Sequence, residues 1–172
     1  MQKKKVLNYN VYIIGFMGVG KSTIMRVFER EYRMDCIDLD NEIEKAEGRS
    51  INRIFAEDGE EYFRRKETET LERLSRRRNT IISCGGGTPL REENRTVMKK
   101  GKVVCLYAPE KTVLKRIRRR HTRPLVENKD DSFVLDLLHE REAIYRSCAD
   151  ICINTDEDSP SGTAARILEQ LI

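Results

Sequence analysis

The sequence contains no tryptophan, only two histidines, and no cysteine pair with the spacing Cys-x-x-Cys. His121 and His139 do not lie near paired cysteines, so a zinc site is not indicated. The chain also lacks a long apolar run near its start. Val11 to Ile14 is too short for the core of a signal peptide or for a membrane span, so we expect a cytoplasmic protein by default.

Neither sign of charge is in large excess. The 33 Lys and Arg residues against 29 Asp and Glu residues give a net charge of +4, which is too small by itself to argue for nucleic acid. At 172 residues, one domain with a real core is expected. The cysteines number five, an odd count that indicates reduced thiols. We expect those in apolar strand-like runs to be small core residues, namely Cys36, Cys84, Cys105 and Cys152.

One motif carries the most information. Residues Gly15 to Ser22 read Gly-Phe-Met-Gly-Val-Gly-Lys-Ser, which fits the phosphate-binding loop G-x-x-x-x-G-K-[ST]. A strand-like run precedes it and a helical pattern follows, the context in which backbone N–H groups cradle phosphate oxygens. Lys21 would then reach the β- and γ-phosphates, and the Ser22 hydroxyl would bind Mg²⁺. The alternative is a Gly-rich turn with a chance Lys-Ser pair.

Short apolar runs alternate with longer charged, helix-like stretches. This alternation implies an α/β fold with a parallel sheet, helices on both faces, and ligands outside the carboxyl ends of the strands. The expected strands are Val11–Ile14, Cys36–Leu39, Thr80–Ser83, Lys102–Tyr107 and Asp150–Ile153. The expected helices are Asn41–Ala46, Ile51–Glu57 behind the cap Ser50, Glu60–Arg78, Pro109 to about Arg118, and Ser132 to about Arg146.

Two carboxylates and three glycines follow expected strands. Asp38 and Asp40 would project together if the strand runs through both, and paired acids there could serve Mg²⁺ and accept a proton from an attacking hydroxyl. Asp40 could also cap the next helix, and the two roles can coexist. The run Gly85-Gly86-Gly87 indicates either close approach of a ligand to bare backbone or a tight turn.

Some arginines fall on faces that the periodicity predicts to point inward. Arg141 shares a helical stripe with Val134, Leu138 and Tyr145, so it needs an internal carboxylate, a bound anion, or a route to the rim. Arg64 could also reach a cleft. The arginine clusters at 76–78 and 118–120 have few aromatic neighbours, so a nucleic-acid stacking platform is not indicated.

Taken together, these motifs resemble the shikimate kinase family over nearly the whole chain. Several ordered motifs at compatible spacing are specific, whereas a phosphate loop alone is not. The motifs are Ile14 to Thr23, Asp38-Leu39-Asp40, Gly48-Arg49-Ser50-Ile51, Ile54-Phe55, Gly59-Glu60 with Phe63-Arg64, Gly85-Gly86-Gly87, Arg123-Pro124-Leu125, and Arg141 with Tyr145.

The resemblance implies a three-layer P-loop kinase fold with a five-stranded parallel sheet, similar to the nucleoside monophosphate kinases. It implies one domain over residues 1–172, with a substrate-binding helical region at about 40–79 and a lid loop at about 118–131. The implied activity is transfer of the γ-phosphoryl group of ATP to the 3-hydroxyl of shikimate, in the chorismate route to aromatic amino acids. We expect a monomer that acts without nucleic acid or a membrane.

The resemblance also assigns roles residue by residue. Arg116 would lie against adenine, and Arg123 would close over the phosphates as part of the lid. Asp40 would be the base, acting with Lys21 and Arg123. The phosphates would be bound by Gly18, Val19, Gly20, Lys21, Ser22 and Thr23, shikimate by Asp40, Arg64, Gly85, Gly86, Gly87 and Arg141, and Mg²⁺ by Ser22 with Asp38 assisting. The segment 155–160 lacks the arginine that some members place there near adenine.

Two other functions compete with this one. Another small-molecule kinase of the same architecture could act on gluconate or a nucleoside monophosphate. A non-catalytic nucleotide-binding or RNA-binding regulator could use the arginine clusters. The combination of Asp40, Arg64, the glycine run and Arg141 on the acceptor side distinguishes a shikimate kinase from the other small-molecule kinases. Retention on nucleic acid without phosphoryl transfer would indicate the regulator.

Overall fold

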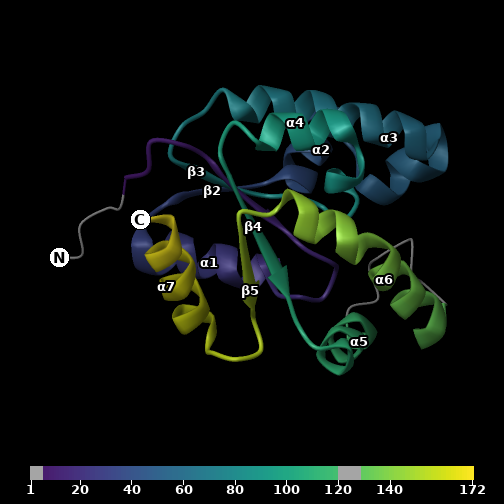
Figure 1. Cartoon of the computed structure of the whole chain (residues 1–172). Helices are drawn as coiled ribbons and strands as arrows, with labels where there is room; N and C mark the ends of the chain where they lie inside the picture. The colour runs from purple at the N-terminus through teal and green to yellow at the C-terminus, as the bar shows by residue number, and fades with distance from the viewer. Residues whose placement is uncertain (1–5, 120–128) are drawn as a thin grey trace.

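A parallel sheet of five strands forms the centre of the molecule. The computed structural model describes residues 6–119 and 129–172. The strands are β1 (Val11–Ile14), β2 (Asp35–Asp38), β3 (Thr80–Ser83), β4 (Lys102–Tyr107) and β5 (Ile151–Asn154). Their order across the sheet is β2-β3-β1-β4-β5, so β1, which leads into the phosphate loop, lies in the middle (Figure 1).

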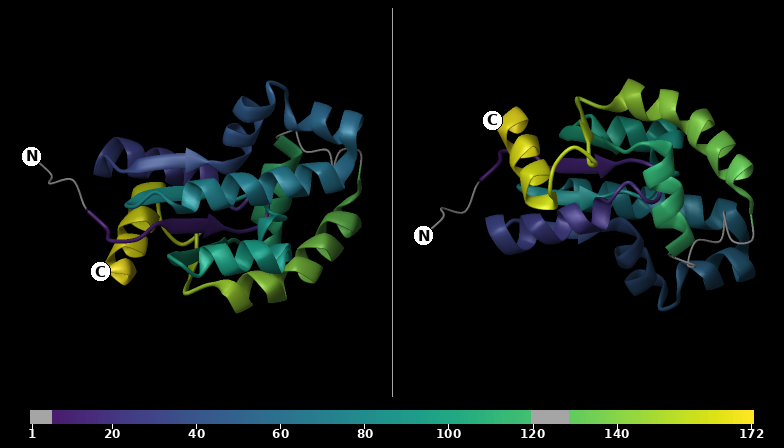
Figure 2. Two further views of the ribbon diagram at one scale, coloured as in Figure 1. Left: turned by 90° about the horizontal axis from the view of Figure 1, so that it is seen from above. Right: turned by 90° about the horizontal axis from the view of Figure 1, so that it is seen from below.

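Helices cover both faces of this sheet (Figures 1 and 2). On one face α1 (Lys21–Tyr32) packs against α7 (Pro160–Leu171). The other face carries α3 (Ile51–Ser75), α4 (Glu92–Met98) and α6 (Asp131–Cys148). The carboxyl ends of β2, β3 and β4 lead into α2 (Leu39–Glu47), the 3₁₀ helix η1 (Thr88–Leu90) and α5 (Glu110–Arg119). The expected three-layer α/β fold is confirmed.

The chain forms these elements for local reasons. All residues of β1 are buried, as expected for a central parallel strand covered on both faces. Helix α3 is capped at Ser50, whose hydroxyl accepts a hydrogen bond from the Arg53 amide at 3.2 Å. At Gly59 (φ 84°) the backbone leaves the helical conformation, so α3 consists of two helical segments. The two helices expected here are therefore present, although the second ends at Ser75 rather than at Arg78.

The boundary between β2 and α2 differs from the expectation. The strand ends at Asp38, and Leu39 already belongs to the helix. Asp38 is the cap, because its Oδ1 accepts a hydrogen bond from the Asn41 amide at 3.0 Å. The expectation that Asp38 and Asp40 project together from one strand is therefore wrong, as is the suggestion that Asp40 caps α2. Aspartate is among the strongest helix caps, and here it starts the helix two residues early.

The cysteines are free thiols with different surroundings. Cys84 and Cys105 are buried as expected, and burial raises the pKa of the Cys105 thiol to about 12. Cys152 is exposed, so its expected place in the core is wrong. It lies on β5, an edge strand of the sheet. Alternating residues of an edge strand can face solvent even when the strand looks apolar in sequence.

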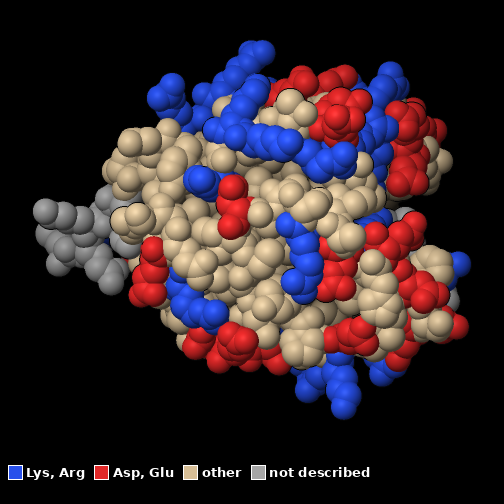
Figure 3. Space-filling view, in the orientation of Figure 1, with Lys and Arg blue, Asp and Glu red and all other residues tan. Residues whose placement is uncertain are grey.

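Charged side chains of both signs cover the outer surface. Figure 3 shows Lys and Arg gathered along the top of the molecule, where α3 and α4 lie, with Asp and Glu beside them. Some of these charges are paired, as Arg91 is with Glu61 at 2.6 Å. None of the helices in the described ranges combines the length and apolar character needed to cross a membrane.

Asn10 connects the start of β1 to the turn before β3. Its Nδ2 donates to the Arg77 carbonyl at 2.8 Å, and its Oδ1 accepts from the Thr80 amide at 3.2 Å. The residue is only 5% exposed. The side chain therefore satisfies backbone groups that would otherwise be left unpaired at the edge of the core.

We predict that Asn10→Ala lowers the free energy of unfolding by about 1–3 kcal/mol, because the buried Thr80 amide loses its acceptor. Urea unfolding would measure the change. Asn52→Ala, on an exposed position of α3, is the matched control and should stay within about 0.5 kcal/mol of the parent. Equal stability of the two variants would show that Asn10 contributes nothing specific.

Candidate active site

The strand register brings three loops to one edge of the sheet. Asp38 pairs with Ser83 on β3, and Ser83 pairs in turn with Ile13 on β1. The three strands therefore end level with one another. The segments that follow them are the start of α2, the glycine run 85–87 and the phosphate loop, and all three meet at the carboxyl edge, where open α/β sheets bind ligands.

The amino end of α1 has the features of an anion-binding site. Gly20 precedes the helix with φ 102°, a left-handed conformation that glycine adopts without strain. No side chain caps the helix, and its first turn contains no acidic residue. The N–H groups and the positive end of the helix dipole are therefore available to phosphate oxygens.

The phosphate loop lines a cavity together with residues from distant parts of the chain. Arg116 donates to the Gly18 carbonyl at 3.2 Å, which holds α5 against the loop. The Lys21 ammonium donates to the carbonyls of Gly15 and Phe16 at 2.6 and 3.0 Å. The lining contains every expected nucleotide-binding residue in the described ranges, namely Gly18, Val19, Gly20, Lys21, Ser22, Thr23 and Arg116, and adds Ile24, Arg119, Thr155 and Pro160.

Thr155 is a contributor that the sequence reasoning missed. Its hydroxyl donates to the Val19 carbonyl at 2.6 Å, and its amide donates to the Tyr107 carbonyl at 2.9 Å. The residue thus connects the end of β5 to the phosphate loop. Its position directly after a parallel strand was the available signal, because every such position lies at the ligand-binding edge.

A second cavity lies on the other side of the phosphate loop. It is lined by Met17, Asp40, Ile51, Phe55, Phe63, Arg64, Glu67, Gly85, Gly86, Gly87 and Arg141. All of the residues expected to bind the acceptor are among them. The apolar residues of this lining suit the body of a small ring, and the charged residues suit polar substituents on it. A tight turn alone therefore does not account for the glycine run.

Arg64 has an internal partner. Its Nη1 lies 2.9 Å from Oε1 of Glu67, a carboxylate that is 0% exposed. Thr88 donates its hydroxyl to the other oxygen of Glu67 at 2.8 Å. Glu67 was not expected from the sequence. It lies four residues from both Phe63 and Leu71 on the buried stripe of α3, and a charged residue on a buried stripe indicates an internal partner, as it does for Arg141.

Arg141 has a less complete set of partners. It is 6% exposed, and its Nε has no hydrogen-bond partner among the described residues. None of the ion pairs within those residues involves Arg141, although its side chain interacts with that of Tyr145. A buried guanidinium without a carboxylate partner is suited to pair with an anion. The Tyr145 hydroxyl donates to the Gly86 carbonyl at 2.5 Å, and burial raises the pKa of Tyr145 to about 12. Tyr145 therefore stays a hydrogen-bond donor at neutral pH.

The two cavities share the phosphate loop as a common wall. Met17 lines the acceptor cavity and the next residue, Gly18, lines the nucleotide cavity. A Cβ placed on Gly86 would lie 3.9 Å from the Gly15 carbonyl oxygen and 3.2 Å from Nη1 of Arg141. A phosphate held by the loop and an acceptor held by the second cavity would therefore be neighbours.

The residues expected to bind metal also lie together. Ser22 and Asp38 line one further cavity beside the phosphate loop. The described residues contain no cluster of three or more His, Cys, Asp or Glu side chains that could hold a metal ion by themselves. One hydroxyl and one carboxylate fit Mg²⁺, which usually completes its oxygen shell with phosphates and water. Arg123 and most of the expected lid lie outside the described residues.

A phosphate loop that shares a wall with a pocket containing a carboxylate, arginines and bare glycine backbone defines a P-loop kinase of small molecules. Residues 17–172 match the family model described as shikimate kinase. A shikimate kinase of Caldicellulosiruptor bescii is 40% identical over 161 residues, which cover 92% of this chain and 93% of that protein. The chain belongs to the shikimate kinase family.

Solved structures agree with this assignment. The shikimate kinase of Acinetobacter baumannii in complex with shikimate is 34% identical, with a TM-score of 0.89 over 95% of this chain and 92% of that chain. The shikimate kinase of Aquifex aeolicus is 38% identical, with a TM-score of 0.81 over 94% of this chain and 95% of that one. The fold and the family thus rest on separate comparisons of sequence and structure.

Gly87 provides a test of the acceptor cavity. A Cβ on Gly87 would lie 2.6 Å from Cζ of Arg64, whose position is fixed by Glu67. We predict that Gly87→Ala displaces this guanidinium and raises the Kd for shikimate by about tenfold, within the range for a hydrogen bond to a charged group. Calorimetric titration of the folded variant would measure it. In an Arg64→Ala background Gly87→Ala should add little, and additive losses would contradict the mechanism.

Proposed function

We propose that this chain transfers the γ-phosphoryl group of ATP to the 3-hydroxyl of shikimate, giving shikimate 3-phosphate and ADP. Membership of the shikimate kinase family supports this activity. The main support for the site is that the phosphate loop borders both cavities. In one of them the buried Nε of Arg141 has no hydrogen-bond partner among the described residues and could bind an anion.

On the donor side, binding and charge neutralisation do most of the work. The N–H groups at the start of α1 and the Lys21 ammonium would hold the β- and γ-phosphates, with Thr155 and Arg116 keeping the loop in place. Phosphoryl transfer requires in-line placement more than covalent help from the protein. Ser22 and Asp38 would hold Mg²⁺, which neutralises charge on the phosphate oxygens.

On the acceptor side, the pocket would orient a small carboxylate. Arg141 and Arg64 can form charge-assisted hydrogen bonds with that group, and the planar guanidinium favours bidentate geometry. Asp40 lines the same cavity and would accept the proton of the attacking hydroxyl. The region 40–79 would therefore be the acceptor-binding part of the domain, because it supplies Asp40, Ile51, Phe55, Phe63, Arg64 and Glu67.

Exclusion of water completes the proposed mechanism, because water competes with the hydroxyl as an acceptor. The loop 118–131 with Arg123 is expected to provide the closure, and that role stays a prediction. We further propose that the protein works as a monomer in the cytoplasm. The free state of all its cysteines fits a reducing compartment, and sedimentation of the purified protein would report its oligomeric state.

The direct test measures ADP release by purified protein with Mg-ATP and shikimate, gluconate or AMP as the acceptor. We expect turnover with shikimate alone, and loss of turnover in Lys21→Ala, where the γ-phosphate loses its cation. Turnover only with gluconate or AMP would make the protein a different small-molecule kinase. Retention on nucleic acid at physiological salt without turnover would favour the regulator.

Asp40→Asn removes the proposed proton acceptor while keeping the size of the side chain. We predict that kcat falls by about 100-fold or more, with the fold intact, because general-base catalysis typically contributes that much. Steady-state kinetics with circular dichroism as the check on folding would measure the change. An unchanged kcat would reject the role of Asp40 as base.

Arg141→Ala removes one of the cations proposed to hold the carboxylate. We predict that the KM for shikimate rises by about 10- to 150-fold, the range for a hydrogen bond to a charged group, while the KM for ATP changes much less. Arg146→Ala, on an exposed position of the same helix, is the matched control. A larger effect on ATP than on shikimate would place Arg141 on the nucleotide side.

A further inference from the structure

The turn between β5 and α7 is acidic, and it borders the nucleotide cavity. Thr155, which opens the turn, and Pro160, the first residue of α7, line that cavity. Between them stand Asp156, Glu157 and Asp158, three consecutive acidic residues. Nucleoside triphosphates carry several negative charges, so an acidic turn at the cavity wall would repel them unless the charge is cancelled.

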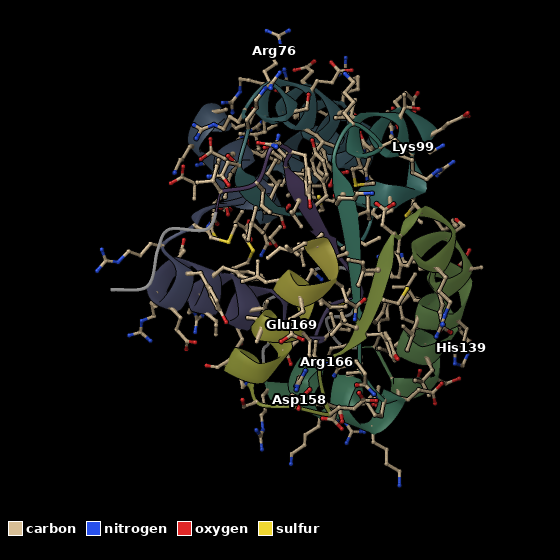
Figure 4. The ribbon with its side chains drawn as sticks, turned by 60° about the vertical axis from the view of Figure 1, so that its left-hand side comes forward. Arg76, Lys99, His139, Asp158, Arg166 and Glu169 are labelled. Carbon is tan, nitrogen blue, oxygen red and sulfur yellow. The ribbon has the colours of Figure 1, made fainter. Side chains whose placement is uncertain are left out.

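Arg166 lies beside this turn. It belongs to α7, and its Nη1 lies 3.1 Å from Oε2 of Glu157 and 2.8 Å from Oδ2 of Asp158. In Figure 4 the labelled Arg166 and Asp158 lie next to each other at the lower end of α7. Glu157 also accepts a hydrogen bond from the side chain of Asn154, at 3.3 Å. One guanidinium therefore bridges two carboxylates that lie in the chain between Thr155 and Pro160, two residues of the cavity lining.

The pairing is a tertiary contact rather than a feature of the helix. Arg166 reaches back eight and nine residues to its partners, beyond the spacing of three or four that neighbours on a helix share. An exposed ion pair contributes at most about 1 kcal/mol to stability, so this contact adds little to the free energy of folding. Its position next to a polyanion site gives it a second effect, on the electrostatic potential of the cavity.

The cations of the cavity wall come from other elements. Lys21 belongs to α1, and Arg116 and Arg119 belong to α5. The segment that contributes Thr155 and Pro160 to the wall contains three carboxylates and no basic residue. Among the described residues, Arg166 forms the ion pairs with the acidic residues of this segment, and the positive amino end of α7, which begins at Pro160, adds a smaller contribution.

We propose that Arg166 is a positioning residue of the nucleotide site. It offsets part of the negative charge of Glu157 and Asp158 and holds the turn that carries Thr155, and in this way it raises the affinity for nucleoside di- and triphosphates. The proposal rests on ATP binding in this cavity under the function proposed above. It predicts that the contribution of Arg166 grows with the charge of the nucleotide and shrinks with added salt.

Calorimetric titration of the full chain with ATP, ADP and AMP would test this, at about 20 mM and about 500 mM NaCl, because salt screens exposed charges. At low salt, Arg166→Ala should weaken ATP binding by about three- to tenfold, ADP binding less, and AMP binding by less than about twofold. At high salt the nucleotide affinities of Arg166→Ala should approach those of the parent protein. Lys99→Ala removes the same charge from the exposed end of α4 and should leave ATP binding unchanged.

Further variants separate charge from structure. Adding Glu157→Gln and Asp158→Asn to Arg166→Ala should restore ATP affinity, and Arg166→Lys should keep most of it. A loss that is equal for ATP and AMP, that ignores salt, or that the double neutralisation does not rescue would overturn the proposal. These titrations need no turnover. If the parent binds ATP but does not phosphorylate shikimate, the proposed function is wrong, and the titrations still test the role of Arg166 in nucleotide binding.

Discussion

The rest of the structure depends on one constraint, the uncapped amino end of α1 and the glycine loop in front of it. A helix end without a side-chain cap leaves N–H groups that need an oxygen partner, and a phosphate supplies it. Such a loop works only if its shape is maintained. Lys21, Arg116 and Thr155 do this by donating hydrogen bonds to loop carbonyls from α1, α5 and the end of β5. Elements far apart in sequence are thus tied to one turn, which explains why so much of the fold converges on this edge of the sheet.

A second feature of the structure is the burial of two arginine side chains in one cavity. Arg64 and Arg141 are both buried in the lining of the acceptor cavity, yet they are compensated in different ways. Arg64 has a fully buried carboxylate partner, Glu67, which itself accepts a hydrogen bond from Thr88. Arg141 has an Nε without a partner among the described residues. A buried guanidinium without a carboxylate partner is suited to attract an anion, and a guanidinium fixed by a carboxylate offers directional donors. On the nucleotide side, Arg166 pairs with Glu157 and Asp158 and so reduces the negative charge of that turn.

Much of this could be predicted from sequence, and the errors have identifiable causes. Three of the five strands have the bounds that their apolar runs predicted, because a strand buried on both faces has to be apolar throughout. The start of α2 was misplaced, since a propensity for strand and a strong helix cap compete over the same residues at Asp38. Cys152 was placed in the core because composition does not reveal which strand lies at the edge. Glu67 and Thr155 had signals in the buried stripe of α3 and in the position after a strand, but the sequence did not reveal their hydrogen-bond partners Thr88 and Val19, which lie 21 and 136 residues away.

The sequence by itself determined the chemistry of the parts. The phosphate-loop motif, the glycine run, and the carboxylate and arginines of the acceptor side are local patterns, and their residue types restrict what each can bind. Only the tertiary structure decided how those parts meet. Strand order and register place the loops at one edge, so that Met17 and Gly18, neighbours in the chain, face two different cavities. The physical reason is that contacts such as Arg166 with Glu157, or Thr155 with Val19, depend on distances across the fold, which no local pattern specifies.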